Sequence, residues 1–205
     1  MRRIGIEPRQ SFDLGKPEGV VKGRWTVPYP TLSRPCGRRP RRFRVVNGWQ
    51  MNTDTMGVYG NSCLKRAIIA MVALGANLPE DAVYPLNLGD ADGKPLIGAN
   101  KYVLRFAKNE IPPANAFWSV TLYDKDGFPA ANDLKRHAID ERDAFRSNPD
   151  GSVELYIQHE SSGTDKESSW LLAPAGDFNL TMRMYSPRAQ VLDGSWAPPA
   201  IKKVQ

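Results

Sequence analysis

Four segments in the second half of the chain alternate apolar and polar side chains, and this pattern constrains the fold most. The segments are KYVLRF (101–106), AFWSVTLYD (116–124), SVELYIQHE (152–160) and DFNLTMRMYS (177–186). Their apolar positions are Tyr102, Leu104 and Phe106; Trp118, Val120 and Leu122; Val153, Leu155 and Ile157; and Phe178, Leu180, Met182 and Met184. Because successive residues of a strand point to opposite faces of a sheet, these segments are predicted to be half-buried antiparallel strands.

Asp-Gly pairs beside these segments predict chain reversals. They are Asp92-Gly93, Asp126-Gly127 and Asp150-Gly151, and glycine adopts the positive φ of tight turns at little cost. Two of them also fit a D-x-D-G pattern, but the later oxygen ligands and closing glutamate of a calcium loop do not follow. We therefore expect hairpin turns, and a mainly β antiparallel sandwich of jelly-roll type over residues 84–205.

One amphipathic helix is predicted before this β region. In SCLKRAIIAMVALGAN (62–77), an apolar stripe recurs at helical spacing, with Asn61 or Ser62 as the N-cap and Gly75 ending the helix. The stripe consists of Leu64, Ala67, Ile68, Met71, Val72 and Leu74. This helical lead-in covers residues 45–83. The segment NDLKRHAIDERDAF (132–145) fits either a short helix or a further strand.

The net charge of +6 belongs to the start of the chain. Residues 1–50 contain 12 Lys and Arg against three Asp and Glu, whereas residues 51–205 contain 16 against 19. Six arginines crowd into the run Arg34–Arg44, which could bind nucleic acid weakly by neutralising phosphates. Pro35 and Pro40 interrupt this run and few aromatic side chains accompany it, so we favour an irregular basic arm over residues 1–44.

The motifs resemble a known bacterial family. PPANAFWSVTLYD (112–124), LYIQHESSGTDKESSWLLAPAGDFNLTMRMYSP (155–187) and LDGSWAPPAIKKV (192–204) occur in an order similar to the C-terminal domain filed as domain of unknown function 1214. VNGWQMNTDTMGVYGN (46–61) is similar to the segment leading into that domain. The resemblance implies a jelly-roll β-sandwich, usually preceded by a domain filed as 1254 and often exported. It implies no established reaction and no catalytic residues.

The first quarter of the chain departs from the family pattern. The large preceding domain is missing, and the arginine-rich stretch resembles nothing in the family, so we expect a fragment that arises from truncation or a frameshift near residues 31–44. A missing N-terminal partner domain or a second copy of the chain is then the expected partner. The start, MRRIGIEPRQSFDLG, has no apolar run and is not expected to be a secretory signal. The longest run of small apolar residues, Ala67–Ala76, has ten residues, where a membrane-spanning helix needs about 20.

One polar loop could support catalysis. His159, Glu160, Asp165 and Glu167 lie close together in the sequence and could act in acid–base chemistry, with His159 as the base. No G-x-S-x-G motif is present, and a purely structural polar loop is the alternative. With only two histidines, and with Cys36 and Cys63 far apart, we expect no metal site. No glycine-rich phosphate loop is present either, and we expect no cofactor.

Aromatic side chains on the polar strand faces are the candidate ligand-binding residues. Tyr123, Tyr156 and Tyr185 alternate onto those faces, and Trp170 closes the polar loop. A concave surface of this kind would bind an apolar or carbohydrate ligand; otherwise it would cover a partner domain or second subunit. The sequence thus favours a non-catalytic binding or assembly domain. A hydrolase using His159 is the alternative, and nucleic-acid binding through the arginine run is the third.

Overall fold

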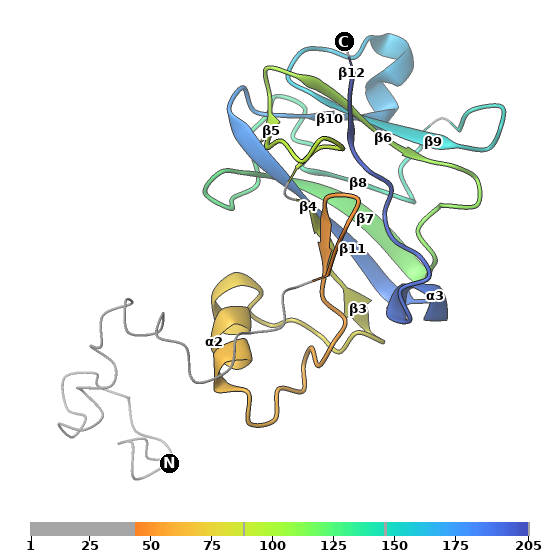
Figure 1. Cartoon of the computed structure of the whole chain (residues 1–205). Coiled ribbons are helices and arrows are strands. Elements are labelled where there is room, and N and C mark those ends of the chain that lie inside the picture. Colours follow the sequence, from red (N-terminus) through yellow and green to blue (C-terminus); the bar gives the residue numbers. More distant parts are fainter. Residues whose placement is uncertain (1–43, 88, 146, 205) are drawn as a thin grey trace, which may run out of the picture. The chain divides into compact units, whose positions relative to one another are not determined.

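The computed structural model describes residues 44–87, 89–145 and 147–204 (Figure 1). Within this part of the chain the protein is mainly β, with two sheets and few, short helices. The predicted mainly β class is therefore confirmed. The predicted basic arm lies outside the described residues except for Arg44, whose Nη2 donates a hydrogen bond to the Gly194 carbonyl at 3.1 Å.

The larger sheet is antiparallel, and β11 lies at its centre. Its path runs β1-β2-β4-β11-β7-β8, and β3 and β5 also pair with β11. The strands are β1 (Arg44–Val46), β2 (Trp49–Met51), β3 (Ala82–Val83), β4 (Leu86–Asn87), β5 (Leu96–Ile97), β7 (Ala114–Asp124), β8 (Ala138–Asp140) and β11 (Asp177–Pro187). The long β7–β11 pair is the frame to which the short strands are attached.

The smaller sheet is mixed and has the order β10-β9-β6-β12. Its strands are β6 (Lys101–Phe106), β9 (Val153–Gln158), β10 (Trp170–Leu172) and β12 (Lys202–Val204), and β10 runs parallel to β9. The helices are α2 (Cys63–Val72), the 3-10 helix η3 (Thr164–Ser169) and α3 (Ala189–Leu192). In the described part of the chain no helix has the length and apolar character needed to cross a membrane.

Both sheets contribute their apolar faces to one core. Every apolar residue predicted for the four alternating segments is at most 6% exposed, and all belong to this core. Rings from the two sheets meet there: Tyr102 and Phe178 have ring centres 5.9 Å apart, and Phe106 and Trp118 are 5.5 Å apart. The predicted alternation is thus confirmed in all four segments.

The Asp-Gly pairs form turns, as predicted, but two of them do not form the predicted β-hairpins. The strands β4 and β5 around Asp92-Gly93 each pair with β11, and β8 and β9 around Asp150-Gly151 lie in different sheets. Gly93, Gly127 and Gly151 have φ values of +75°, +84° and +78°, in the left-handed region that glycine tolerates. In each D-x-D-G pattern the first aspartate stabilises the turn. Oδ1 of Asp90 accepts hydrogen bonds from the backbone N–H groups of residues 92 and 94, and Oδ1 of Asp124 accepts them from residues 126 and 128.

The helix differs from its prediction. It ends at Val72, before Gly75, and the Ser62 side chain makes no capping hydrogen bond. Met71 and Leu74, predicted for its apolar face, are 58% and 86% exposed, whereas Ile69 is 4% exposed. The prediction was wrong for Leu74 because the chain leaves helical geometry at Ala73, where φ is −152°. It was wrong for Met71 because the helix turns Ile69, which was not in the predicted stripe, toward the protein.

Two further segments become strands. Residues 45–83 contribute β1, β2 and β3 to the larger sheet in addition to the helix. The first two are joined by Asn47-Gly48, both with positive φ, the geometry of a two-residue hairpin turn. Of the two structures left open for residues 132–145, the strand is observed, as β8.

Candidate functional site: a tyrosine groove on the larger sheet

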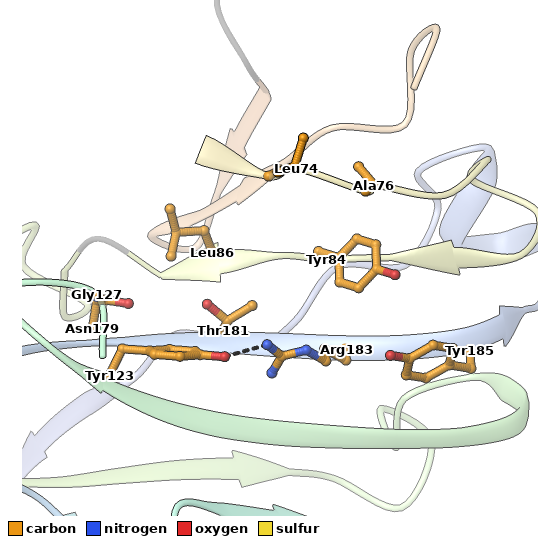
Figure 2. Close-up of a pocket in the computed structure, with 12 residues that line it drawn as sticks. Leu74, Ala76, Tyr84, Leu86, Tyr123, Gly127, Asn179, Thr181, Arg183 and Tyr185 are labelled. Atoms are coloured by element: carbon orange, nitrogen blue, oxygen red, sulfur yellow. Dashed lines mark hydrogen bonds between the residues drawn. The ribbon is translucent and has the colours of Figure 1, made fainter. Parts of the chain in front are cut away.

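A groove of about 620 Å³ lies over the face of the larger sheet that points away from the core (Figure 2). Its walls are formed by segment 73–76 after α2, Tyr84 and Leu86, Gly127, Tyr123 of β7 and alternate residues of β11. We call it the tyrosine groove. Its lining residues are Ala73, Leu74, Gly75, Ala76, Tyr84, Leu86, Tyr123, Gly127, Asn179, Thr181, Arg183 and Tyr185.

Strand register brings the sheet residues of the groove together. Asn179 pairs with Tyr123, and Tyr185 pairs with Phe117, along β7 and β11. Because side chains alternate between faces every second residue, Asn179, Thr181, Arg183 and Tyr185 all point away from the core, in a row along β11. The structure therefore places the predicted residues Tyr123 and Tyr185 in one groove.

Arg183 is the charged residue at the centre of this row. It is half-buried; its Nη1 donates to Thr121 Oγ1 at 2.6 Å, and its Nη2 donates to the Tyr123 hydroxyl. Among the residues that the structure describes, no carboxylate forms an ion pair with it. An arginine side chain stays protonated in proteins, so the groove holds a positive charge whose described partners are neutral hydroxyls.

An aromatic cluster forms the end of the groove beside Tyr185. The Tyr185 ring stacks on Phe117, with ring centres 4.6 Å apart, and meets Tyr84 edge to face at 6.4 Å. Burial raises the pKa of Tyr84, and the neighbouring Tyr185 adds to that rise. The Arg142 guanidinium lies 4.8 Å from the Phe117 ring centre and forms an ion pair with Asp140 at 2.6 Å. This end of the groove is therefore built from three aromatic rings in contact with one another.

The other two predicted ligand-binding residues lie on the smaller sheet. Trp170 is 7% exposed, and its Nε1 donates to the Gln158 carbonyl at 3.0 Å. Tyr156 donates to Glu154 at 2.7 Å and has Lys166 Nζ 4.4 Å from its ring centre. Burial, followed by the hydrogen bond to Glu154 and its charge, raises the pKa of Tyr156 to about 12. Neither residue lines the tyrosine groove.

The four predicted catalytic candidates lie on the surface around η3. His159, Glu160, Asp165 and Glu167 are all exposed. Nδ1 of His159 is 2.9 Å from the Ala173 carbonyl oxygen, and Glu160 pairs with Lys101 at 3.4 Å. Within the described ranges no hydrogen bond or ion pair joins His159 to any of these carboxylates.

The second histidine lies elsewhere. Nδ1 of His137 is 3.0 Å from the Ala130 carbonyl oxygen, in the connection between β7 and β8. Over the part of the chain that can be described, no group of three or more His, Cys, Asp or Glu side chains is arranged to hold a metal ion.

Sequence reasoning missed three residues of this site. Arg183 occupies the same strand face as the predicted tyrosines. It is the one cation at positions 179, 181, 183 and 185, so the sequence contains a signal that could have identified it. Thr121 lies on the same face of β7 and is 9% exposed. Tyr84 carries no comparable signal, because only the pairing of β3 and β4 with β11 brings it to the groove.

Two solved structures illustrate what this chain is similar to. The VPA0106 protein from Vibrio parahaemolyticus is 30% identical with a TM-score of 0.59, over 66% of this chain and 34% of that one. A putative uncharacterized protein from Burkholderia cenocepacia is 14% identical with a TM-score of 0.45, over 77% of this chain and 34% of that one. This chain thus spans about a third of the length of each. A search of curated proteins found no match.

Comparison with protein families gives one assignment. The profile described as "Protein of unknown function (DUF1214)" matches residues 81–189, more than half of the chain. The matched range contains most of the larger sheet, three strands of the smaller one and the β7–β11 pair beneath the tyrosine groove. The chain belongs to the DUF1214 family.

Proposed function

We propose that this chain is a non-catalytic binding domain and that its ligand occupies the tyrosine groove. The observation that carries the proposal is the half-buried Arg183, whose guanidinium is held by Thr121 and Tyr123 and not by a described carboxylate. Removing a charge from water is costly unless a partner compensates it. A ligand with complementary groups would supply that compensation, in a groove whose volume suits a small molecule.

The groove's chemistry favours binding over proton transfer. In the described part of the chain its lining residues include tyrosine, threonine, asparagine and arginine side chains, but no histidine, cysteine, aspartate, glutamate or lysine. Histidine and carboxylate side chains are the usual general acids and bases of enzymes. The alternative hydrolase would use His159, Glu160, Asp165 and Glu167, which lie outside the groove.

Nuclear magnetic resonance of the tyrosine and arginine side chains tests this proposal. A panel of neutral and charged ring compounds is titrated into the chain, and we expect ligands to shift the resonances of Tyr123, Tyr185 and Arg183 Nε. Tyr156, on the smaller sheet, serves as the internal control and should not move. Shifts confined to Tyr156, Trp170 and His159 would instead locate the binding site at the polar loop and contradict the proposal.

Assembly is the second candidate, and the exposed apolar rim of the groove favours it. Leu74 is 86% exposed and Phe128, next to Gly127 of the groove lining, is 68% exposed. Large exposed apolar side chains that gather at one place are typical of protein interfaces. We infer that in a longer two-domain bacterial protein, of which this chain would be a fragment, a preceding domain of the kind filed as 1254 covers this rim.

Binding of a separately purified preceding domain from a full-length relative tests the assembly role. Leu74→Ser should weaken association about tenfold, the size expected for one buried leucine. Val204→Ser, in the smaller sheet and 38% exposed, is the matched control and should leave association unchanged. Self-association of the chain through the same rim, measured by analytical ultracentrifugation, would instead identify a second copy as the partner.

We also propose the finer architecture expected from the sequence. The two sheets would form a β-sandwich of jelly-roll type over residues 84–205, to which the lead-in of residues 45–83 adds strands of the larger sheet, with the basic arm of residues 1–44 before it. The core shared by both sheets supports the sandwich. An experimental structure tests it directly, and two sheets that do not face each other would exclude it.

A further inference from the structure

We propose that the tyrosine groove selects a small monocarboxylate with an apolar body, and that Arg183 and Tyr123 bind the carboxylate while Thr121 holds Arg183 in position. This inference rests on the proposed binding function and names its ligand class. Figure 2 shows the arrangement behind it: Arg183 lies between Tyr123 and Tyr185 along one side of the groove, with Leu86 and Tyr84 on the neighbouring segment.

The first argument is the direction of the hydrogen bonds. Oγ1 of Thr121 and the hydroxyl oxygen of Tyr123 both accept from Arg183. Among the described residues the Tyr123 hydroxyl donates no hydrogen bond, so its proton can be donated to a ligand in the groove. A guanidinium has five N–H donors and no acceptor, and these bonds engage two of them. Arg183 therefore offers a ligand only donors, and the Tyr123 hydroxyl can donate its proton as well, an arrangement that suits an anion.

The second argument is the amount of charge. Arg183 is the one charged side chain among the groove's lining residues in the described part of the chain. One negative charge balances it, whereas a phosphate dianion would bring uncompensated charge into a half-buried site. The planar guanidinium fork also matches the two oxygens of a carboxylate. A monocarboxylate is thus favoured over a phosphate.

The third argument is the apolar part of the groove. Leu74, Leu86 and the rings of Tyr84 and Tyr185 line it, and the two rings are fixed by their edge-to-face contact and by Phe117. The volume of about 620 Å³ lies within the roughly 300–1,000 Å³ of typical small-molecule sites. A ring or short aliphatic chain attached to the carboxylate would fill this space.

Calorimetric titration with matched probe pairs tests the inference. Benzoate, phenylacetate and octanoate are compared with benzamide, phenylacetamide and octanamide, and with inorganic phosphate. We expect each carboxylate to bind at least about tenfold more tightly than its amide, as charge-assisted hydrogen bonds imply. We expect inorganic phosphate not to compete with the carboxylates. Arg183→Gln should remove this preference, while Arg66→Gln, an exposed arginine on α2 outside the lining, should keep it.

Two milder variants test the inference even if Arg183→Gln does not fold. Tyr123→Phe removes one donor and Thr121→Val removes one contact that holds Arg183, and each should reduce carboxylate affinity several-fold with little change for the amides. Equal binding of acids and amides within the groove would overturn the carboxylate inference and leave the binding function standing, and competition by phosphate would overturn the selectivity for one charge. If no probe shifts the resonances of Tyr123, Tyr185 or Arg183, both proposals fail.

Discussion

Arg183 pairs with Ser119 in the register of β7 and β11, yet its guanidinium donates to the hydroxyl of Tyr123, further along β7. The arginine side chain therefore runs along the sheet surface, past Thr121, to which it also donates at 2.6 Å. This path couples two strands on the face opposite the core. It also means that the groove's charge is held in place by the central strand pair.

A double-mutant cycle should detect this coupling. Tyr123→Phe and Arg183→Met should each lower the free energy of unfolding by about 1 kcal/mol, as expected for a partly exposed hydrogen bond. Because both remove the same bond, the double variant should lose less than the sum, by about 0.5 kcal/mol or more. Urea unfolding of the wild type, two single variants and the double variant gives the four values required.

The Trp49 side chain should link the N-terminal hairpin to the last segment of the chain. It is fully buried, and its Nε1 donates to the Pro199 carbonyl at 2.8 Å. Trp49→Phe should cost about 2–4 kcal/mol, because it leaves a cavity and an unpaired carbonyl. Trp196→Phe is the control: Trp196 also donates to a backbone carbonyl, of Glu110 at 3.1 Å, but is half-buried, so we expect about 1 kcal/mol. Equal losses in urea unfolding would contradict the assigned link.

The strands of the core could be predicted from the sequence because their signal is local. In β9, for example, Val153, Leu155 and Ile157 are buried and alternate with Glu154 and Tyr156, and a period of two residues implies this arrangement without knowledge of any partner strand. Two-residue strands such as β3, β4 and β5 have no period to detect. They exist because β11 offers them backbone partners, which is a long-range relationship.

The hairpin β1–β2 is a different case, since its signal is present in the sequence. Asn47-Gly48 is a strong hairpin dipeptide, placed between Val45-Val46 and Trp49. The prediction for residues 45–83 rests on the apolar stripe of the helix and does not include this hairpin turn. Predicting this hairpin requires weighing two local patterns, the Asn-Gly pair and the helical stripe, and requires no long-range contact.

The site was predictable only in part, for the same reason. Tyr123 and Tyr185 could be assigned to polar strand faces, but the face alone does not say which sheet a strand joins. Tyr156 has the same local pattern and lies in the smaller sheet. The sequence therefore predicts which residues face away from the core, and strand pairing decides which of them meet.

A close backbone approach at Gly98 should make this position intolerant of any side chain. A Cβ atom there would lie 1.7 Å from the Pro174 carbonyl oxygen, and the Gly98 N–H bonds the Gly176 carbonyl at 2.9 Å. Gly98→Ala should therefore destabilise the chain by about 3 kcal/mol through forced backbone movement. The measurement is the urea unfolding midpoint, with an unchanged slope as evidence that the native state stays compact.

Gly176→Ala is the matched control for that substitution. A Cβ at Gly176 would have no atom within 4 Å, and the residue does not adopt positive φ. Alanine should therefore be neutral there or stabilise by up to about 1 kcal/mol, through the lower entropy of the unfolded chain. A tolerated Gly98→Ala would show that the segment around Pro174 moves freely and would contradict the close approach.

The Tyr156 hydroxyl should lose its proton only at strongly alkaline pH. Its pKa is about 12 in the folded chain, raised first by burial and then by the hydrogen bond to Glu154 and its charge, whereas an unperturbed tyrosine titrates near 10. Glu154→Gln should lower this pKa while leaving it above 10, because burial is the largest cause. The pKa of Tyr84, raised by burial in the larger sheet, should not respond to Glu154→Gln. NMR titration of the ring carbons distinguishes the two tyrosines.

The raised pKa of Tyr156 also determines how the free energy of unfolding changes at alkaline pH. The folded chain keeps the Tyr156 proton where the unfolded chain has lost it, so this residue's contribution to the free energy of unfolding is fully present below about pH 10 and is lost as pH rises through about 12. In Tyr156→Phe the alkaline decline should be shallower over that interval. If Tyr156→Phe and the wild type lose stability in parallel between pH 10 and 12, the tyrosine titrates at its ordinary pKa and the Glu154 contact does not hold its proton.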